Sequence, residues 1–297
     1  MPSDILSLHL VEMSPQMRQI QEAALCGYFH GHSHAKNEMT NEKDANNRDS
    51  NQMYEHKAIT KYGQKVYWYP RIEDVPKGFS FYLAHEFFDA LPIHKFVKTK
   101  DKLWREILVD IDEQNNKLRF VQANFKTPAL HAVNFDSNCS KDAVEISPKT
   151  GVIIQHISDC IDKYGGGALI ADYGEDNVSE DSFRGFKEHK LHDVLTDPGT
   201  ADLTADVDFS YLKRQCSEHT TFYGPVTQSK FLKALGIDIR YAKLKETGTT
   251  DSKDLDLAYH SLTDEDKMGN RFKFCAVFPK TMQPIHLKYP PAGFENN

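Results

Sequence analysis

The sequence of 297 residues predicts an α/β fold built around an open β-sheet. Leu6–Val11 alternates as a strand and passes through Glu12 into a capped helix. Two short apolar runs, residues 79–84 and 168–171, have the length and composition of strands buried on both faces, and acidic residues follow each run. Ligands bind at the carboxyl ends of strands in such sheets, so these acids mark the predicted ligand site.

The first element ends in a carboxylate. Ser14 and Pro15 are typical of the N-cap and first turn of a helix, which we expect over Gln16–Leu25. A strand, an acidic residue and a capped helix in this order are how a nucleotide-binding fold presents a carboxylate to ribose hydroxyls, and Glu12 has that place. The alternative interpretation is a surface glutamate at a strand end.

A polar stretch follows, from about His30 to Lys57, whose few apolar residues cannot form a buried face. We expect a long mobile loop there. His30, His32 and His34 alternate within it, but no cysteine or carboxylate stands at ligand spacing in a rigid element, so we predict no metal site.

Further strands and helices complete the predicted sheet. Ser147-Pro148 caps a helix whose Ile153, Ile157 and Ile161 form one apolar stripe. The glycines at 165–167 precede a strand, whereas a phosphate loop follows one, so we interpret them as a helix-to-strand turn. The other expected elements are a strand at 66–69, a β-hairpin of 103–111 and 117–123, helices at 207–214 and 227–235, and a closing strand at 272–278 preceded by a weakly helical stretch.

Composition excludes several classes of protein. The 43 Asp and Glu outnumber the 36 Lys and Arg, giving a net charge of −7, which argues against nucleic acid as a partner. No apolar run is long enough to span a membrane, and no targeting peptide is visible. The five cysteines are far apart and odd in number, so we expect reduced thiols rather than a disulfide framework.

The acidic residues at the strand ends suit a cationic ligand. Glu86 and Asp89 follow one buried strand and Asp172 the other, with Tyr173 beside it, and together with Glu12 they would converge at one edge of the sheet. The alternative is that Asp89 caps a turn and Asp172 is structural.

Five stretches carry a resemblance to a known family. They closely resemble the MidA-type protein arginine methyltransferases, nearest to the animal mitochondrial members that are complex I assembly factors. The similarity extends over nearly the whole chain, to Phe278. The stretches are His9–Pro15, Asp74–Phe96, Gly166–Gly174, Asp197–Phe209 and Gly224–Ile237.

The resemblance implies a Rossmann-like, S-adenosylmethionine-dependent methyltransferase sheet with helices on both faces and a β-hairpin insertion. It implies S-adenosyl-L-methionine as methyl donor and a location in the mitochondrial matrix. It further implies symmetric dimethylation of an arginine on a core subunit of complex I, the NADH dehydrogenase, as a step that promotes assembly of that complex.

The resemblance also assigns roles to residues. Glu12 resembles the acid that holds the cofactor ribose, and His85 and Asp172 are further candidates for cofactor contacts. Glu86 and Asp89 are the candidate catalytic residues, because carboxylates can grip the planar fork of an arginine and aim one nitrogen at the methyl group. The candidate substrate-binding residues, Asp202, Thr204 and Asp206, are expected on a helix, where capping of its N-terminus is the alternative role.

The family's first strand and glycine-rich loop have no counterpart here, since the chain begins at what resembles strand two. We therefore expect a sheet whose first strand is missing and a chain that alone binds S-adenosylmethionine weakly or not at all. The expected organisation is strand and helix of the core (1–29), polar insertion (30–57), the rest of the core (58–280) with the hairpin region near 97–145, and a tail (281–297).

Three hypotheses of function follow. The first is an arginine methyltransferase, with this chain a shortened form. The second is a non-catalytic assembly module that has lost the cofactor site. The third, a histidine-rich metal hydrolase, is disfavoured by the scattered histidines. The sequence leaves the target arginine and the oligomeric state open.

Overall fold

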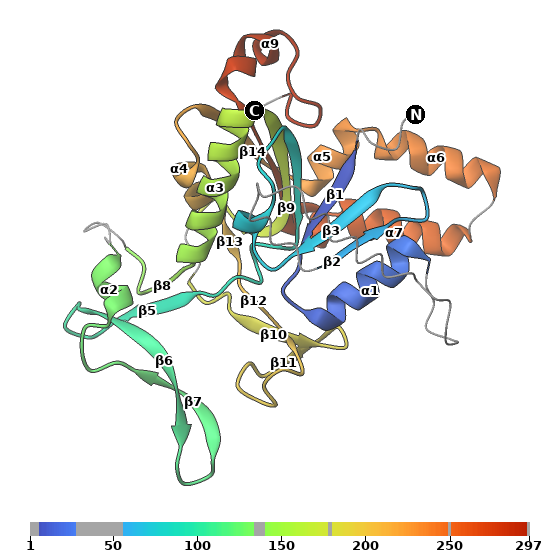
Figure 1. The fold of residues 1–297 in the computed structure, drawn as a ribbon. Coiled ribbons are helices and arrows are strands. Elements are labelled where there is room, and N and C mark those ends of the chain that lie inside the picture. Colours follow the sequence, from blue (N-terminus) through green and yellow to red (C-terminus); the bar gives the residue numbers. More distant parts are fainter. Residues whose placement is uncertain (1–5, 28–55, 134–139, 178–179, 249–250, 296–297) are drawn as a thin grey trace, which may run out of the picture. The chain divides into compact units, whose positions relative to one another are not determined.

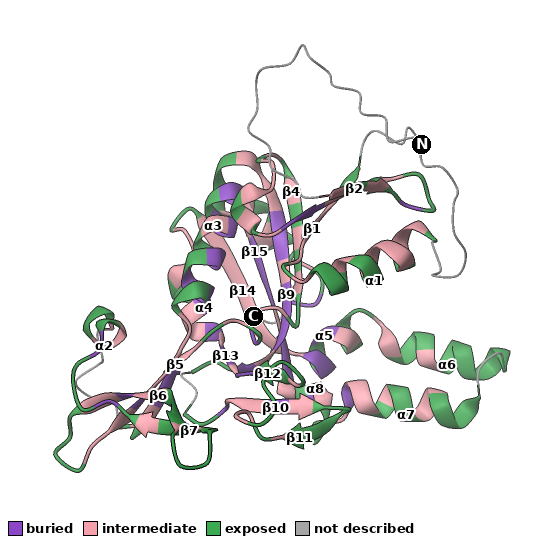
Figure 2. Cartoon of the chain, turned by 60° about the horizontal axis from the view of Figure 1, so that its bottom comes forward, coloured by how far each residue is buried: buried purple, intermediate pink, exposed green. Residues whose placement is uncertain are grey.

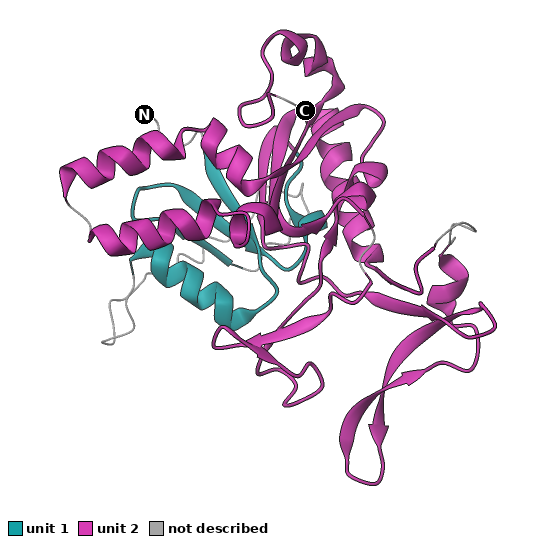
Figure 3. Ribbon diagram, turned by 180° about the vertical axis from the view of Figure 1, so that it is seen from behind, with its two compact units in different colours: residues 1–77 teal, residues 78–297 magenta. Residues whose placement is uncertain are grey.

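The computed structural model describes residues 6–27, 56–133, 140–177, 180–248 and 251–295 (Figure 1). The chain divides into two compact units, residues 1–77 and 78–297 (Figure 3), and each is described by itself.

Unit 1 is a three-stranded sheet with one helix. β1 (Ser7–Val11) runs parallel to β3 (Lys65–Tyr69), and β2 (His56–Ile59) pairs with the other side of β3 in the antiparallel sense. Helix α1 (Pro15–Cys26) follows β1, and the Ser14 hydroxyl caps it by accepting from the Met17 amide at 3.2 Å. The predicted strand and capped helix are thus confirmed. A short 3₁₀ helix, η1 (Ile72–Asp74), ends the unit.

Most of the expected polar insertion, including His30, His32 and His34, lies outside the described residues. Its last two residues, His56 and Lys57, belong to β2, so the predicted boundary was slightly too late. Within the described part of unit 1, the buried side chains are Thr60, Val66, Trp68 and Tyr69.

The central sheet of unit 2 has the order β13-β9-β15-β14, and β4 lies parallel to β9. The strand β9 is therefore hydrogen-bonded to β4 and β13 in the parallel sense and to β15 in the antiparallel sense. The bounds are β4 (Ser80–His85), β9 (Gly166–Glu175), β13 (Val207–Asp208), β14 (Thr220–Thr227) and β15 (Phe272–Pro279).

Helices cover both faces of this sheet, as expected. Phe231 of α5 (Gln228–Ala234) stacks on Phe274 of β15 with ring centroids 4.1 Å apart. Successive residues of a strand point to opposite faces, so the fully buried Cys275 and Val277 point to the other side, where α3 (Pro148–Tyr164) packs. Figure 2 shows buried residues concentrated along β9, β15 and one side of α3.

The stripe of α3 is confirmed: Ile153, Ile157 and Ile161 are all buried, and Ser147 caps the helix. Gly165 is its C-cap and β9 begins at Gly166, which confirms the helix-to-strand turn.

Three expectations need correction. The strand at β4 is not buried on both faces, because Phe81 and Leu83 are 76% and 75% exposed, while alternate residues are partly buried. Residues 207–214 begin as the two-residue strand β13 and become helix α4 (Phe209–Gln215) only after Asp208, whose carboxylate caps it. Residues 202–204 are a strand, β12 (Asp202–Thr204), rather than part of a helix.

The expected hairpin is present as part of a second sheet of unit 2, with the order β7-β6-β5-β8. A third sheet has the order β11-β10-β12. The remaining elements are β5 (His94–Lys98), β6 (Trp104–Asp112), β7 (Lys117–Gln122), α2 (Pro128–Ala132), β8 (Ala143–Ile146), β10 (Arg184–Lys187), β11 (Lys190–His192), α6 (Ile237–Thr247), α7 (Ser252–Thr263), α8 (Met268–Arg271), η2 (Lys280–Met282) and α9 (Gln283–Lys288).

The described helices include no segment with the length and apolar character needed to cross a bilayer. The four described cysteines, Cys26, Cys160, Cys216 and Cys275, are free thiols.

Candidate functional site

The candidate site of unit 2 lies where β4 and β9 end. The two strands are parallel neighbours in register from Ser80 opposite Gly166 to His85 opposite Ala171, so the residues that follow them meet at one edge of the sheet. The loop after β4 carries Glu86 and Asp89, and β9 contributes Asp172 and Tyr173.

Asp172 is fully buried and its carboxylate faces the loop after β4. Its Oδ2 accepts from the backbone amides of Phe87, Phe88 and Asp89 at 3.1, 3.0 and 3.4 Å, and its Oδ1 accepts from the Tyr173 amide at 2.9 Å. Burial, followed by the nearby charge of Asp89, raises the pKa of Asp172 to about 7, although the backbone amides act in the opposite direction.

Glu86 adopts a left-handed backbone conformation with φ of 46°, which is uncommon for a residue other than glycine. Its amide donates to the Ala171 carbonyl at 3.0 Å. Its side chain is half-exposed, and Oε1 lies 4.0 Å from Nε2 of the exposed His85.

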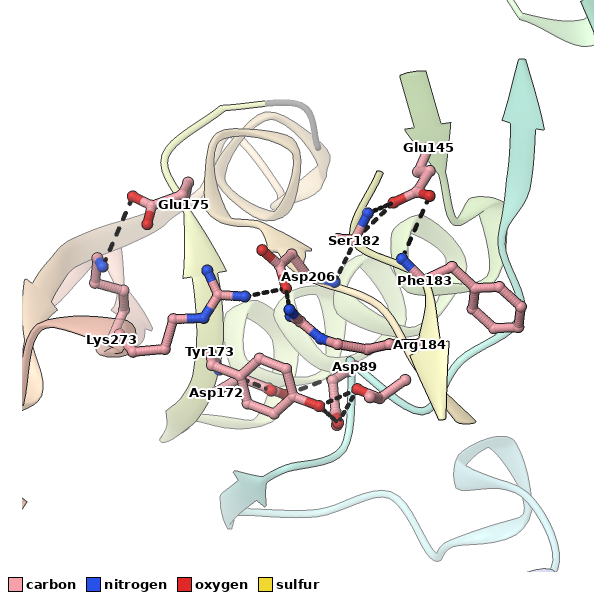
Figure 4. A network of polar contacts seen from close by, with 12 residues as sticks. Asp89, Glu145, Asp172, Tyr173, Glu175, Ser182, Phe183, Arg184, Asp206 and Lys273 are labelled. Atoms are coloured by element: carbon pink, nitrogen blue, oxygen red, sulfur yellow. Dashed lines mark hydrogen bonds and ion pairs between the residues drawn. The ribbon is translucent and has the colours of Figure 1, made fainter. Parts of the chain in front are cut away.

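Asp89 is a second buried carboxylate, 8% exposed. Its Oδ2 accepts from the Tyr173 hydroxyl at 2.6 Å and from the Thr204 hydroxyl at 2.8 Å, and these two hydroxyls also contact each other (Figure 4). Its Oδ1 is buried and has no hydrogen-bond partner among the described residues. Burial, and then the bond to Asp89, raise the pKa of Tyr173, so the phenol stays a proton donor.

Two arginines surround the neighbouring Asp206. The guanidinium groups of Arg184 and Arg271 both pair with Asp206 Oδ1 and lie 5.9 and 5.8 Å from the centre of the Tyr173 ring (Figure 4). The Asp206 amide donates to the Ser182 hydroxyl at 2.8 Å. The charge of Asp206 is therefore matched by two cations of the chain itself.

A cavity of about 1070 Å³ lies beside this cluster in unit 2. Phe88, Ala205 and Asp206 line it on the side of the cluster, and β8 and α4 line other parts of its wall. Its wall is mixed, with apolar side chains such as Val144 and Val207 next to charged ones. A cavity of this size and character can receive a large side chain.

The structure brings part of the predicted set together. Asp89, Asp172 and Thr204 form one cluster, with Asp206 beside it, whereas Asp202 is an exposed residue of β12. Neither Asp202 nor Thr204 caps a helix; Asp208 does. Glu86 and His85 stand at the rim of the same loop, and Glu12 belongs to unit 1.

Glu12 stands directly after β1, as expected. Its Oε1 accepts from the Ser14 amide at 2.8 Å and its Oε2 from the Gln21 side chain at 3.2 Å. The carboxylate is partly exposed at the carboxyl end of a parallel strand, and this placement fits an acceptor for the hydroxyl groups of a ribose.

Sequence reasoning missed Arg184 and Arg271. Arg184 lies in β10 and Arg271 ends α8, far apart in sequence and outside any recognisable pattern, so only the tertiary structure shows that they share Asp206. Among the described residues, no group of three or more His, Cys, Asp or Glu side chains is placed to hold a metal ion.

Comparison with known sequences finds a family model described as "Putative S-adenosyl-L-methionine-dependent methyltransferase" over residues 2–226. Over 97% of its length, the chain is 48% identical to the Xenopus laevis protein named "Protein arginine methyltransferase NDUFAF7, mitochondrial". It is 47% identical to the human protein of the same name over 92% of its length. The chain spans 64% and 59% of the lengths of these two relatives.

Two crystal structures of Burkholderia thailandensis proteins share the fold, each covering 72% of the chain at 21% identity. One matches with a TM-score of 0.62 and 59% of its own chain covered. The other, bound to S-adenosyl-homocysteine, matches with a TM-score of 0.59 and 57% of its own chain covered. At this identity the likeness concerns the fold alone.

Proposed function

Because the chain belongs to the family of S-adenosyl-L-methionine-dependent methyltransferases, we propose that it acts as a protein arginine N-methyltransferase with its site at the carboxyl ends of β4 and β9. The observation that carries this proposal is that Oδ1 of Asp89 is buried and has no hydrogen-bond partner among the described residues. A buried carboxylate oxygen without a partner is costly, and a substrate N–H group that reaches it would remove the cost.

A guanidinium suits this acceptor. Its five N–H donors lie in a rigid plane, and it stays charged at any working pH. In the proposed complex Asp89 accepts from one nitrogen, Tyr173 and Thr204 hold Asp89 in place, and Glu86 contacts the guanidinium from the rim. The adjacent cavity receives the rest of the arginine side chain.

S-adenosylmethionine, when bound, supplies a methyl group on a sulfonium that leaves as a neutral thioether. Glu12 would hold the ribose. His85, the last residue of β4, stands next to Glu86 and is a further candidate for a cofactor contact. The attacking nitrogen gains a methyl carbon and loses one proton, and the half-exposed Glu86 carboxylate can accept that proton and release it to water.

The finer assignment follows the relatives. Their names support a protein substrate and a mitochondrial protein. We propose, from the family resemblance, a location in the matrix and symmetric dimethylation of one arginine on a core subunit of complex I. A complex I core subunit is thus the proposed partner.

Glu86→Gln tests the proposal, assayed in the protein expressed from the full-length transcript. We expect methyl transfer to fall at least about a hundredfold, because the variant keeps the size of the side chain but loses the charge that positions the guanidinium. Calorimetric titration should show S-adenosylmethionine affinity within about threefold of the wild type.

Glu188→Gln is the matched control, since Glu188 is another exposed glutamate with positive φ, 51°. It lies in the turn between β10 and β11 and does not line the cavity. Near-normal turnover of Glu86→Gln, or equal loss in both variants, removes Glu86 from its proposed role.

A further inference from the structure

Both carboxylate oxygens of Asp172 accept hydrogen bonds from the backbone of the chain itself. One oxygen receives three successive backbone amides of the loop after β4, and the other receives the amide of Tyr173. We propose that Asp172 is a positioning residue, whose carboxylate anchors residues 87–89 and so sets where Glu86 and Asp89 stand. The positioning role rests on the proposed methyl transfer.

The conformation of Glu86 explains why an anchor is needed. A non-glycine residue at φ of 46° is strained and persists only where the surrounding contacts determine it. The Glu86 amide is bound to the Ala171 carbonyl at 3.0 Å, and the next three amides are bound to Asp172. The strained residue is thus fixed from both sides by β9.

Asp89 is fixed in the same way. Its amide points to Asp172, and its carbonyl accepts from the Ala205 amide at 3.0 Å. Its carboxylate orientation then follows from the Tyr173 and Thr204 hydroxyls. Without the anchor, the backbone that presents this carboxylate loses its constraint on one side.

Only the ionised carboxylate, the form present above the Asp172 pKa of about 7, satisfies all four amides, because both of its oxygens then accept and neither donates. In Asp172→Asn, an amide NH₂ must face either the loop amides or the Tyr173 amide. The variant therefore keeps the volume of the side chain and loses acceptors on one side.

Glu145 provides a matched comparison within unit 2. This buried carboxylate accepts from the Ser182 and Phe183 amides at 2.9 and 3.4 Å and from the Ser182 hydroxyl (Figure 4). It also pairs with Lys95 at 3.5 Å, but it anchors a different loop through backbone amides, so Glu145→Gln is the control for Asp172→Asn in the exchange experiment.

The experiment is amide hydrogen exchange of the wild type and both variants. In Asp172→Asn we expect the amides of Phe87 and Phe88 to exchange at least about tenfold faster, with residues 182–183 unchanged. In Glu145→Gln we expect the opposite pattern. Faster exchange of both loops in both variants means general loosening and overturns the proposal, as does an unchanged rate at Phe87 and Phe88 in Asp172→Asn.

Kinetics then separate positioning from stability. Asp172→Asn should lower kcat for methyl transfer about a hundredfold while KM for S-adenosylmethionine changes less than about threefold. Glu188→Gln, whose side chain lines neither the cavity nor the cluster, should leave both values near those of the wild type. Equal kcat in Asp172→Asn and wild type overturns the positioning role. If the wild type transfers no methyl group but the exchange result holds, the proposed function fails and the anchoring of the loop stands.

If Asp172→Asn does not fold, a pH titration of the wild type, followed by nuclear magnetic resonance, still tests the anchoring of the loop. The amide proton shifts of Phe87 and Phe88 should move together as the Asp172 carboxyl titrates between about pH 5 and 9. The ionisable groups that interact with it are Asp89 from the loop, the Cys275 thiol from β15 and the neighbouring Tyr173 phenol. Shifts that stay constant while Asp172 titrates overturn the proposal.

Discussion

Asp89 and Asp172 are two buried aspartates with different partners. Backbone amides surround Asp172. Two hydroxyls bind one oxygen of Asp89, and no other described residue hydrogen-bonds to its second oxygen. Backbone amides cannot reorient to serve a substrate, but an acceptor without a partner can bind one. The two residues therefore suit different tasks, with Asp172 holding the loop and Asp89 meeting the substrate.

The pH dependence of stability should report Asp172. In the unfolded chain its carboxyl loses a proton near the ordinary value of 3.8, but in the folded protein it keeps the proton until about pH 7. Between these values the unfolded state binds fewer protons, so the contribution of Asp172 to stability falls as the pH rises, and it is constant above the folded pKa.

We expect the free energy of unfolding of the wild type to fall by roughly 2 kcal/mol relative to Asp172→Asn from about pH 5 to pH 7, since one pKa unit corresponds to about 1.4 kcal/mol. Urea denaturation of both proteins across this range measures the difference. A difference that does not depend on pH contradicts a raised pKa.

At the scale of elements, the pairing of β4 with β9 builds the site. The first pair in register, Ser80 and Gly166, brings the two backbones so close that a Cβ on Gly166 would lie 1.9 Å from the Ser80 carbonyl oxygen. Gly166 also has a φ of 104°, which side chains disfavour. A glycine at this point therefore allows the strand pair that aligns the loop with Asp172.

Gly166→Ala should lower the free energy of unfolding by more than about 2 kcal/mol, through backbone strain and a clash that no side-chain movement can relieve. Gly78→Ala is the control, because nothing lies within 4 Å of the added Cβ, and it should change stability by less than about 0.5 kcal/mol. Similar stability of the two variants, measured by chemical denaturation, would show that the close approach is unimportant.

Periodicity and caps predicted the elements that local sequence controls. The Ser14 and Ser147 caps and the Ile153 stripe belong to this group, and α1 and α3 were correct within a residue or two. The short strands β12 and β13 were missed, because the Asp202–Asp208 stretch also has helix-capping residues and only pairing with β10 and β9 makes it extended. The exposed face of β4 was missed because an apolar run does not tell which faces are covered.

The site, like the fold, was predictable only where local sequence determines the position of a residue. Glu86, Asp89 and Asp172 lie at the carboxyl ends of strands, where ligands bind in such sheets, so the sequence could place them. Tertiary pairing, which no sequence spacing encodes, brings in Arg184, Arg271 and the hydroxyl of Thr204. The resemblance to the methyltransferase family supplied the cofactor and substrate, which composition alone left open.

At the scale of the whole molecule, each unit has buried residues of its own. Trp68 and Tyr69 are buried in unit 1, and Ile154, Ile170 and Val277 in unit 2. Unit 2 also contains every predicted site residue except Glu12. The proposed guanidinium site and the proposed ribose contact thus belong to different units.

We therefore expect residues 78–297, expressed alone, to fold cooperatively, because their core is formed within that unit. Thermal unfolding followed by near-ultraviolet circular dichroism should show one sigmoidal transition. A gradual loss of signal without a transition would mean that unit 2 requires residues 1–77 to fold.

The central claim is that this site methylates an arginine. Its most direct test is mass spectrometry of isolated complex I core subunits after incubation with S-adenosylmethionine and the protein expressed from the full-length transcript. We predict one arginine that carries a methyl group on each terminal nitrogen, and no such product with Glu86→Gln. Methyl groups found only on other residue types, or equal arginine methylation by Glu86→Gln and the wild type, would contradict the account.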